Sequence, residues 1–448
     1  MRTRSRTTRL LAATAFVSVS AIVLAGCTGS PGAASPGAAA TGSLTIPTKD
    51  PTATVTVLSI LDLKTDNMQA VIDAFEKAHP SITIKFQTVP FDSLNSTVDA
   101  HIANKTGDPD VYWADQPRIS ALASRGEALD LTSVFSQYKS SFDPTTYASG
   151  VYNNKLYALP IANSTQLLYY NKDLLAKAGL SAPSADVTAR MTWEDLTTDA
   201  TKAKAAGAEY GLMFGQFDRY YQLECLPVSL GGSVGASGAG NLTPDFTSTA
   251  WVKAMDWYGS IFKSGVAPRG VTPEQTDALF LAGKTAYMVE GPWLLQSLQT
   301  SKLNWGVAPQ PTFAGGKAVT ADGSWSLALN PFSKEKEAAA IFMKWMAIDD
   351  GGGYIKYRTN PELAATIVGK KTYFAKDVFA STEGKAAAKI IDYETANTAV
   401  NRVSTIGYIE FESILNQAFA DIRNGADAKS TLDKASSQLT TAWLKYKK

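Results

Sequence analysis

Side chains that bind transition metals or form disulfide bonds are scarce in this sequence, which has two cysteines and two histidines among 448 residues. His79 and His101 are too few to build a typical zinc site, and neither lies in the motif of a serine or cysteine nucleophile. We therefore expect both histidines on the surface, and neither a metal nor another cofactor. Cys225 has no partner for an internal disulfide once Cys27 is assigned to the N-terminal segment described below, and we expect it to be a small buried apolar residue.

The sequence also lacks an excess of charge of either sign, with 42 Lys and Arg against 41 Asp and Glu. Four of the arginines lie within the first nine residues, so the rest of the chain carries 38 basic and 41 acidic residues, a net charge of −3. This balance gives no electrostatic reason to expect a nucleic acid or an anionic lipid surface as a partner. Beyond residue 24 no apolar run is long enough to span a bilayer.

The first 27 residues have the pattern of a secretory signal. Arginines at positions 2, 4, 6 and 9 precede an apolar run over 10–24, and small residues follow at the expected cut. The segment Leu24-Ala25-Gly26-Cys27 resembles the lipobox of bacterial lipoproteins. This resemblance implies that residues 1–26 are removed and that Cys27 becomes a lipidated N-terminus, held on the extracytoplasmic face of the cell membrane by acyl chains such as palmitate. The alternative is an ordinary secreted protein whose cleavage site happens to lie near a cysteine.

The residues that follow the signal contain nothing that could build a hydrophobic core. Residues 27–53 are rich in Gly, Ser, Pro and Ala, a composition typical of a flexible tether. The folded body is therefore expected to begin near residue 54 and to end near residue 446. Roughly 390 residues exceed what one hydrophobic core usually serves, so we expect two lobes.

The start of the folded body alternates between strand and helix patterns. Short runs with β-branched residues predict strands at 55–60, 82–89 and 110–113. Between them, apolar residues at helical spacing predict a helix over 67–79 and another over 93–105. This alternation indicates an α/β sheet with parallel strand pairs, in which ligands bind beyond the carboxyl ends of the strands. The loops after the first and third strands are therefore candidate sites.

Several segments of the folded body resemble, in order, the extracellular solute-binding proteins of ABC importers, in the carbohydrate-binding family that includes maltose-binding protein. They are AFEKAHPSITI at 74–84, GDPDVYWAD at 107–115, LYALPI at 156–161, LYYNKDLLAKAGL at 168–180, TWEDL at 192–196 and FLAGKTAYMVEGPW at 280–293. The matches are spread over nearly all of the folded body, and their common order is what makes the resemblance specific.

The resemblance implies the two-lobe periplasmic-binding-protein fold. Two α/β lobes would hold a solute in the cleft between them and close around it by bending at hinge crossings. On this chain the amino-terminal lobe would comprise residues 54–165 and 304–332, and the carboxy-terminal lobe residues 166–303 and 333–448. The chain would cross between the lobes where these ranges meet.

A carbohydrate cleft needs aromatic planes that stack on the apolar faces of sugar rings, and carboxylates or amides that bond to the hydroxyl groups. Trp113 and Asp115 follow the third predicted strand, and Trp293 follows a Gly-Pro turn. Ser324 and Trp325 lie in a segment that resembles the Gly-Gly-Trp loop of the family, in which backbone and indole face the solute. The alternatives are a core tryptophan at 113, a helix cap at 115 and a packed helix start at 293.

Other candidates rest on position along the chain. Asp218 and Tyr220 match the positions at which maltose-binding protein supplies an acid and a stacking tyrosine, although the acid here is shorter and Arg219 replaces a proline. The alternative is a surface Asp–Arg pair. The remaining candidates are Asp62 after the first strand, Asn163 at the expected first crossing, and Arg402 and Tyr408 in a late segment that often lends cleft residues in the family.

The residues and the resemblance together predict a binding protein that is not an enzyme. It would be a monomer that captures a sugar or oligosaccharide outside the membrane and delivers it to the permease subunits of an ABC transporter, with no nucleic acid as partner. One alternative is a secreted glycoside hydrolase, which needs two carboxylates at a defined separation. Another is the same fold with a polyol or glycerol phosphate as solute, for which arginines or helix N-termini would be favoured. The aromatic and acidic candidates favour an uncharged sugar.

Overall fold

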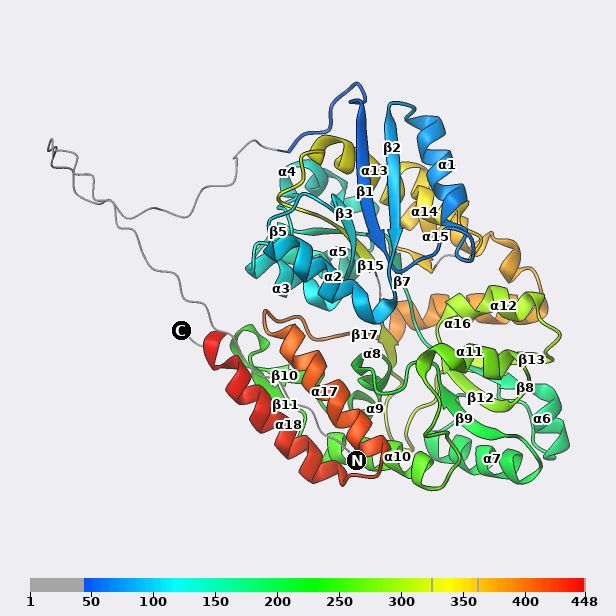
Figure 1. Ribbon diagram of the computed structural model, residues 1–448. Coiled ribbons are helices and arrows are strands. Elements are labelled where there is room, and N and C mark those ends of the chain that lie inside the picture. The colour runs from blue at the N-terminus through cyan, green and yellow to red at the C-terminus, as the bar shows by residue number, and fades with distance from the viewer. Residues whose placement is uncertain (1–43, 324, 361, 447–448) are drawn as a thin grey trace, which may run out of the picture. The chain divides into compact units, whose positions relative to one another are not determined.

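The computed structural model describes residues 44–446 except 324 and 361. The predicted signal over 1–26, the predicted lipidation site Cys27 and most of the predicted tether lie outside these residues. Within them, two mixed sheets covered by helices form two lobes, drawn one above the other in Figure 1. The α/β class and the two-lobe fold expected from the sequence are confirmed.

The first sheet contains the strands predicted from the start of the folded body. Its order is β2 (Ile82–Thr88), β1 (Ala53–Ser59), β3 (Val111–Asp115), β15 (Trp325–Leu329) and β6 (Ala158–Pro160). Strand β1 is parallel to β2 and β3, whereas β15 runs antiparallel to β3 and β6. Helices α1 (Met68–Ala78) and α2 (Phe91–Ala103) follow β1 and β2, and α1 buries apolar residues at the three- and four-residue spacing of one helix face. All five predicted elements are confirmed, with bounds within two residues.

The second sheet is built from segments that lie far apart in the sequence. Its order is β13 (Trp305–Pro309), β8 (Leu167–Asn171), β12 (Thr285–Glu290) and β9 (Tyr210–Phe214). Strand β12 is parallel to β9, and β8 is antiparallel to both β12 and β13. The surrounding helices include α7 (Trp193–Ala205), α10 (Thr249–Lys263), α11 (Pro273–Leu281), α16 (Thr382–Asn397), α17 (Tyr408–Arg423) and α18 (Ala428–Ala442).

Two segments pack in the other lobe from the one expected. Strand β13, expected in the amino-terminal lobe, finds its backbone partners in β8 of the second sheet. Helix α13 (Lys336–Ala347), expected in the carboxy-terminal lobe, packs on β1 and β15 of the first sheet and buries Phe342 and Met343 there. The chain therefore passes between the sheets between β6 and β8, between β13 and β15, and between α15 (Ile367–Phe374) and α16.

Short strand pairs join these connecting segments. Strand β14 (Thr320–Asp322) runs parallel to β17 (Ala399–Asn401), and β7 (Ala162–Asn163) pairs with β16 (Leu363–Ala364). The first pair brings the late segment that follows residue 401 next to the carboxyl end of β3 in the first lobe, where the site described below is found.

Cys225 begins the short helix α9 (Cys225–Ser229) and is 2% exposed. Gln310 donates from Nε2 to its sulfur at 2.8 Å, and burial raises the pKa of the thiol to about 12. Cys225 is thus the small buried residue that was expected.

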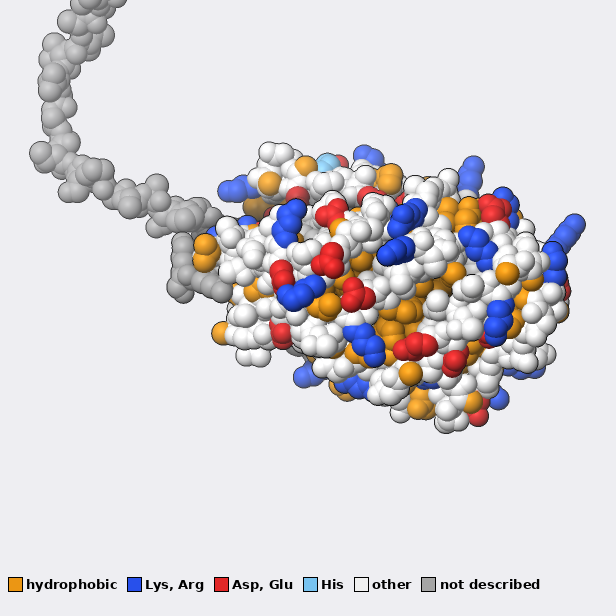
Figure 2. Space-filling view, turned by 90° about the horizontal axis from the view of Figure 1, so that it is seen from below, with side chains coloured by type: hydrophobic (Ala, Val, Ile, Leu, Met, Phe, Trp, Pro, Cys, Tyr) orange, Lys and Arg blue, Asp and Glu red, His pale blue; other side chains and the backbone are white. Residues whose placement is uncertain are grey.

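The surface of the protein reflects the nearly equal numbers of basic and acidic residues in the sequence. On the face in Figure 2, basic and acidic side chains are interspersed. In the part of the chain that the structure describes, no helix has the length and apolar character needed to cross a bilayer. Across the same residues, no three His, Cys, Asp or Glu side chains are arranged to hold a metal ion.

Candidate functional site

A cavity of about 850 Å³ lies between the two lobes and is lined by side chains from both. The carboxyl ends of four strands point to it. Ile60 and Leu61 follow β1, and Asp115 ends β3, as the parallel sheet predicted; Gln216 follows β9 and Trp293 follows β12 in the second lobe. The cavity is therefore placed where open α/β sheets bind ligands.

Aromatic rings line both walls of the cavity. In the first lobe, Trp325 meets Phe91 edge to face, with ring centroids 5.9 Å apart. In the second lobe, Trp293 and Tyr221 line the opposite side. Such planes offer apolar area with defined orientation, which suits a flat ligand that is apolar on its faces and polar at its rim.

Tyr221 is held in place by the connecting segments. Its hydroxyl lies 2.9 Å from Ser164 Oγ, and it accepts a hydrogen bond of 2.7 Å from Gln166 Nε2. Its ring lies against Gly323, where a β-carbon would come within 2.1 Å of the ring. A residue larger than glycine at 323 would therefore displace Tyr221.

A buried ion pair joins the lobes at the back of the cavity. Arg402 forms a two-pronged contact with the Asp115 carboxylate, with Nη1 donating to Oδ2 at 2.7 Å and Nη2 donating to Oδ1. Its guanidinium also lies over the Tyr221 ring, 5.0 Å from the centroid. Burial disfavours the charge on Arg402, but Asp115, Tyr408 and Glu224 outweigh this effect and raise its pKa. Asp115 thus reaches the cavity already bonded to an arginine.

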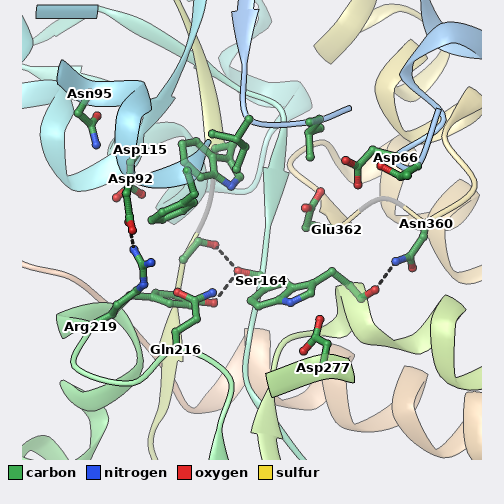
Figure 3. A pocket seen from close by; sticks show the side chains of 18 of the residues that line it. Asp66, Asp92, Asn95, Asp115, Ser164, Gln216, Arg219, Asp277, Asn360 and Glu362 are labelled. Carbon is green, nitrogen blue, oxygen red and sulfur yellow. Dashed lines mark hydrogen bonds and ion pairs between the residues drawn. The ribbon is translucent and has the colours of Figure 1, made fainter. Parts of the chain in front are cut away.

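Two further arginines bridge the cavity. Arg219, which precedes α8 (Tyr220–Leu223) in the second lobe, reaches Asp92 at the start of α2 with an N–O distance of 2.9 Å (Figure 3). Its guanidinium also lies 4.4 Å from the centroid of the Phe91 ring. Arg118 of the first lobe pairs with Glu412 of α17. Three Arg–carboxylate pairs therefore connect the two lobes.

Four of the eleven residues predicted to contact solute line the cavity: Asp115, Trp293, Trp325 and Arg402. Six others lie elsewhere, and Ser324 is outside the described residues. Two of the six are held by local polar contacts. The Asp62 carboxylate accepts the backbone N–H groups of Lys64 and Thr65, which lowers its pKa and closes a turn beside the cavity. Asn163 is buried in β7, and its neighbour Ser164 lines the cavity instead.

The other misplaced candidates belong to the interior of their own lobe. Trp113 is 1% exposed, because β3 is the central strand of its sheet, and its ring packs edge to face on Phe86 and Tyr354. Asp218 pairs with Arg423 at 2.9 Å and accepts a hydrogen bond from Tyr258, and burial raises its pKa.

Tyr220 and Tyr408 are fully buried and pack on one another at the contact between α8 and α17. The Tyr220 hydroxyl donates to the Val234 carbonyl at 2.5 Å, so it faces away from the cavity. Successive residues of a helix point about 100° apart, and Tyr221 therefore takes the position expected for Tyr220. Tyr221, and not the predicted Tyr220, therefore lines the cavity.

Asp115 is the only acidic residue of the cavity lining that was singled out from the sequence, and two of the acids that were missed share one corner of the site. Asp277 on α11 lines the cavity, and Glu290 at the end of β12 lines a smaller pocket beside it. Burial raises the pKa of Asp277 to about 6, and burial together with the charge of Asp277 raises the pKa of Glu290. The sequence signals only the start of α11, through a capping box of Thr272 and Gln275, and nothing in it marks the two acids as neighbours.

Comparison with known proteins gives a consistent result. Residues 62–352 match the model of a family described as bacterial extracellular solute-binding protein. The maltodextrin-binding protein MdxE of Bacillus subtilis (strain 168) is 28% identical over 362 residues, which cover 78% of this chain and 80% of that protein. The galactooligosaccharide-binding protein of the same organism is 26% identical over 311 residues, 67% of this chain and 70% of that protein.

Solved structures agree at the level of the fold. The ABC substrate-binding protein Lmo0181 of Listeria monocytogenes, solved in complex with cycloalternan, superposes with a TM-score of 0.75. The match covers 88% of this chain and 99% of that one at 23% sequence identity.

Proposed function

This chain belongs to the family of bacterial extracellular solute-binding proteins, and on that basis we propose that it captures a sugar or oligosaccharide and delivers it to an ABC transporter permease. The observation that carries the proposal is the pair of aromatic walls, with Trp325 and Phe91 facing a cavity whose other side holds Trp293 and Tyr221. Relatives named for maltodextrin and galactooligosaccharide binding support the same class of solute.

The charges of the cavity favour a solute without a large net charge. Five basic and six acidic side chains line it, and most of them are paired with one another. A glycerol phosphate would need arginines free to bind its phosphate. Arg118, Arg219 and Arg402 are each occupied by a carboxylate, which argues for a polyhydroxylated solute over a phosphorylated one.

The capture mechanism follows from the two-sided lining. A solute between the lobes contacts Trp325 and Trp293 together only when the lobes are close, so it binds the closed form more tightly. The gain in affinity shifts the population to the closed form without covalent chemistry. The closed shape then becomes the signal that a permease can recognise.

The test is a thermal-shift screen of the Cys27→Ala protein against mono-, di- and trisaccharides, polyols and glycerol phosphates. A ligand that binds only the folded state raises the melting temperature by mass action. We expect a rise with one sugar class and a fall in affinity of about 30-fold or more for Trp325→Ala, because a buried aromatic anchor is worth about 2 kcal/mol or more.

Tyr393 is 37% exposed on α16 and lies outside the cavity, so Tyr393→Ala serves as the matched control. It should leave the affinity unchanged. Equal affinities of Trp325→Ala and Tyr393→Ala would remove Trp325 from the site. Release of reducing sugar from an oligosaccharide by the purified protein would instead favour a glycoside hydrolase.

We also propose that Cys27 carries a diacylglyceryl group and that the residues between it and residue 44 tether a monomeric body to the extracytoplasmic face of the membrane. Leu44 and Ile46 already pack against the core of the first lobe, so the folded body begins earlier than the predicted residue 54. The basic start, the apolar run and the Leu-Ala-Gly-Cys motif support this placement. In cell fractionation, the natural protein should sediment with membranes and Cys27→Ala should not. Equal partition of the two forms would favour an ordinary secreted protein.

A further inference from the structure

Beside Trp293 the cavity continues into a smaller pocket of about 170 Å³ with an acidic lining. Glu274, Asp277 and Glu290 lie around it, with Arg219 and the rings of Phe91 and Trp293. We call this the acidic pocket. None of the mechanism proposed above uses its carboxyl groups.

Glu290 lines the acidic pocket and is almost fully buried, with 2% of the residue exposed. Its Oε1 accepts the backbone N–H of Gly291 at 2.9 Å. Its Oε2 lies over the α-carbon of Gly215, where a β-carbon would come within 1.2 Å of that oxygen. Among the residues that the structure describes, no hydrogen-bond donor and no cation is paired with Oε2.

Asp277 is the second carboxyl group of the acidic pocket that is not paired with a cation. It projects from α11 toward the cavity, below the indole that crosses the centre of Figure 3. Within residues 44–446, gaps at 324 and 361 aside, it forms neither a hydrogen bond nor an ion pair. The nearby cation is already used, because Arg219 pairs with Asp92 at 2.9 Å and lies 4.0 Å from Glu274.

A buried carboxyl group and a half-buried one, neither of them paired with a cation, bind protons in preference to carrying charge. This agrees with the raised pKa values of Asp277 and Glu290, each of which is disfavoured as an anion by burial. A positive group placed between them would reverse this preference, since an opposite charge within about 4–6 Å stabilises the carboxylate form. The indole of Trp293 at the same pocket would add a cation–π contact.

A metal ion fits the acidic pocket less well than an ammonium group does. Calcium and magnesium take six or more oxygen ligands, whereas the indole of Trp293 and the ring of Phe91 line this pocket beside its three acidic side chains. Among the described residues, no three His, Cys, Asp or Glu side chains are arranged to hold a metal ion. A protonated amine, by contrast, uses both carboxylates and an aromatic face together.

From this geometry we propose that the acidic pocket binds a protonated amino group of the solute, so that the protein takes an amino sugar or an oligosaccharide that contains one. The inference rests on the proposed capture of a sugar and names the chemical class of that sugar. The amine would lie between Asp277 and Glu290 with the sugar ring next to Trp293.

The test compares matched glycans by calorimetry at pH 7 with the Cys27→Ala protein. The probes are glucosamine and its α- and β-linked disaccharides, their N-acetylated forms, and the corresponding glucose sugars. We expect the amine to bind at least tenfold more tightly than both neutral counterparts. The isosteric variants Asp277→Asn and Glu290→Gln should each reduce this ratio to near one, and their melting temperatures will show whether they fold.

Asp256→Asn is the matched control, because Asp256 is an exposed aspartate on α10 outside the acidic pocket. It should keep the full preference for the amine. Neutral glycans that bind as tightly as their amines would overturn the amine pocket and leave sugar capture standing. A protein that binds no glycan in either experiment would overturn both proposals.

Discussion

Two residues that are adjacent in sequence, Tyr220 and Tyr221, point to different places, one into the interior of its lobe and the other to the cavity. Tyr220 is fully buried against Phe411, with ring centroids 4.8 Å apart, whereas Tyr221 lines the cavity. The motif that matches this segment locates the tyrosine pair, but the start of α8 decides which ring faces the cavity. That start depends on Asn416 of α17, whose side chain accepts the Tyr220 backbone N–H at 2.9 Å, and a contact over so long a separation leaves no local signal.

The close contact between Tyr221 and Gly323 predicts that adding one methyl group at residue 323 disturbs the site. Gly323→Ala would place a β-carbon within 2.1 Å of the Tyr221 ring, so the ring has to move away from Ser164 and Gln166. We expect solute affinity to fall at least tenfold and the protein to lose about 1–3 kcal/mol of stability, as overpacked sites do. Calorimetric titration and denaturant unfolding measure both. Gly315→Ala is not a suitable control because Gly315 has a positive φ, but Gly270→Ala, in open space with an ordinary φ, should change neither quantity.

Asp322 predicts a pH dependence of stability. Burial raises the pKa of Asp322 to about 7, although Arg402 opposes the shift. The folded protein therefore holds a proton that the unfolded chain releases near pH 4, and stability falls as pH rises from about 4 to about 7. In Asp322→Asn this contribution, at most about 4 kcal/mol, is absent. Melting temperatures between pH 4.5 and 8 should fall less steeply with pH for the variant; parallel curves for the two proteins would contradict the assignment.

At the scale of elements, helix α16 depends on a buried charge pair. Arg190, which precedes α7, donates to Glu394 of α16 at 2.8 Å and also to the Gln310 carbonyl at 2.7 Å, and the two side chains are 6% and 0% exposed. The pair connects α16 to the edge of the second sheet next to β13.

Removal of one partner should be far more harmful than removal of both. Arg190→Ala leaves the Glu394 carboxylate buried without its cation, and we expect a loss of about 3–5 kcal/mol in the free energy of unfolding. The double variant Arg190→Met, Glu394→Leu replaces the pair by apolar groups and should recover most of that loss. Urea unfolding of the three proteins measures the difference. A double variant as unstable as the single one would mean that Arg190 acts through Gln310 and not through Glu394.

The elements also mark where sequence reasoning succeeds. Met68, Val71, Ile72 and Phe75 of α1 follow one another at helical spacing, and a pattern contained in eleven residues can be recognised without the fold. Strand β15 cannot be placed in this way, because its neighbours β3 and β6 precede it by more than 150 residues. The acidic pocket is likewise not marked by any local pattern, because Asp277 and Glu290 come together only through the contact of α11 with β12.

At the scale of the whole molecule, the three Arg–carboxylate pairs that join the lobes should set the balance between open and closed forms. Arg118 with Glu412 and Arg402 with Asp115 are largely shielded from solvent, whereas the Asp92 partner of Arg219 is exposed. Pairs of the shielded kind are screened less by salt than exposed ones. A change at Arg118 should therefore shift the balance more than added salt does.

We predict that Arg118→Gln increases the radius of gyration of the solute-free protein, since fewer contacts hold the lobes together. The apparent affinity for solute should fall a few-fold, in proportion to the loss of the binding-competent form. Small-angle X-ray scattering with and without solute measures both states. Lys429→Gln removes an exposed pair with Asp433 within α18 and should leave the scattering curve unchanged. A solute-free Arg118→Gln protein as compact as the parent would show that other contacts hold the lobes.

The buried state of Cys225 has a practical consequence for work on this molecule. The residue is 2% exposed and burial raises the pKa of its thiol to about 12, so reagents that need an accessible thiolate will not react with it near neutral pH. With Cys27 replaced, a cysteine introduced at the exposed, cavity-lining position Ser413 would be the one reactive group on the chain. A fluorophore attached there would sit at the mouth between the lobes, and its emission would report each arrival of solute, turning the protein into an optical sensor for the compound it collects.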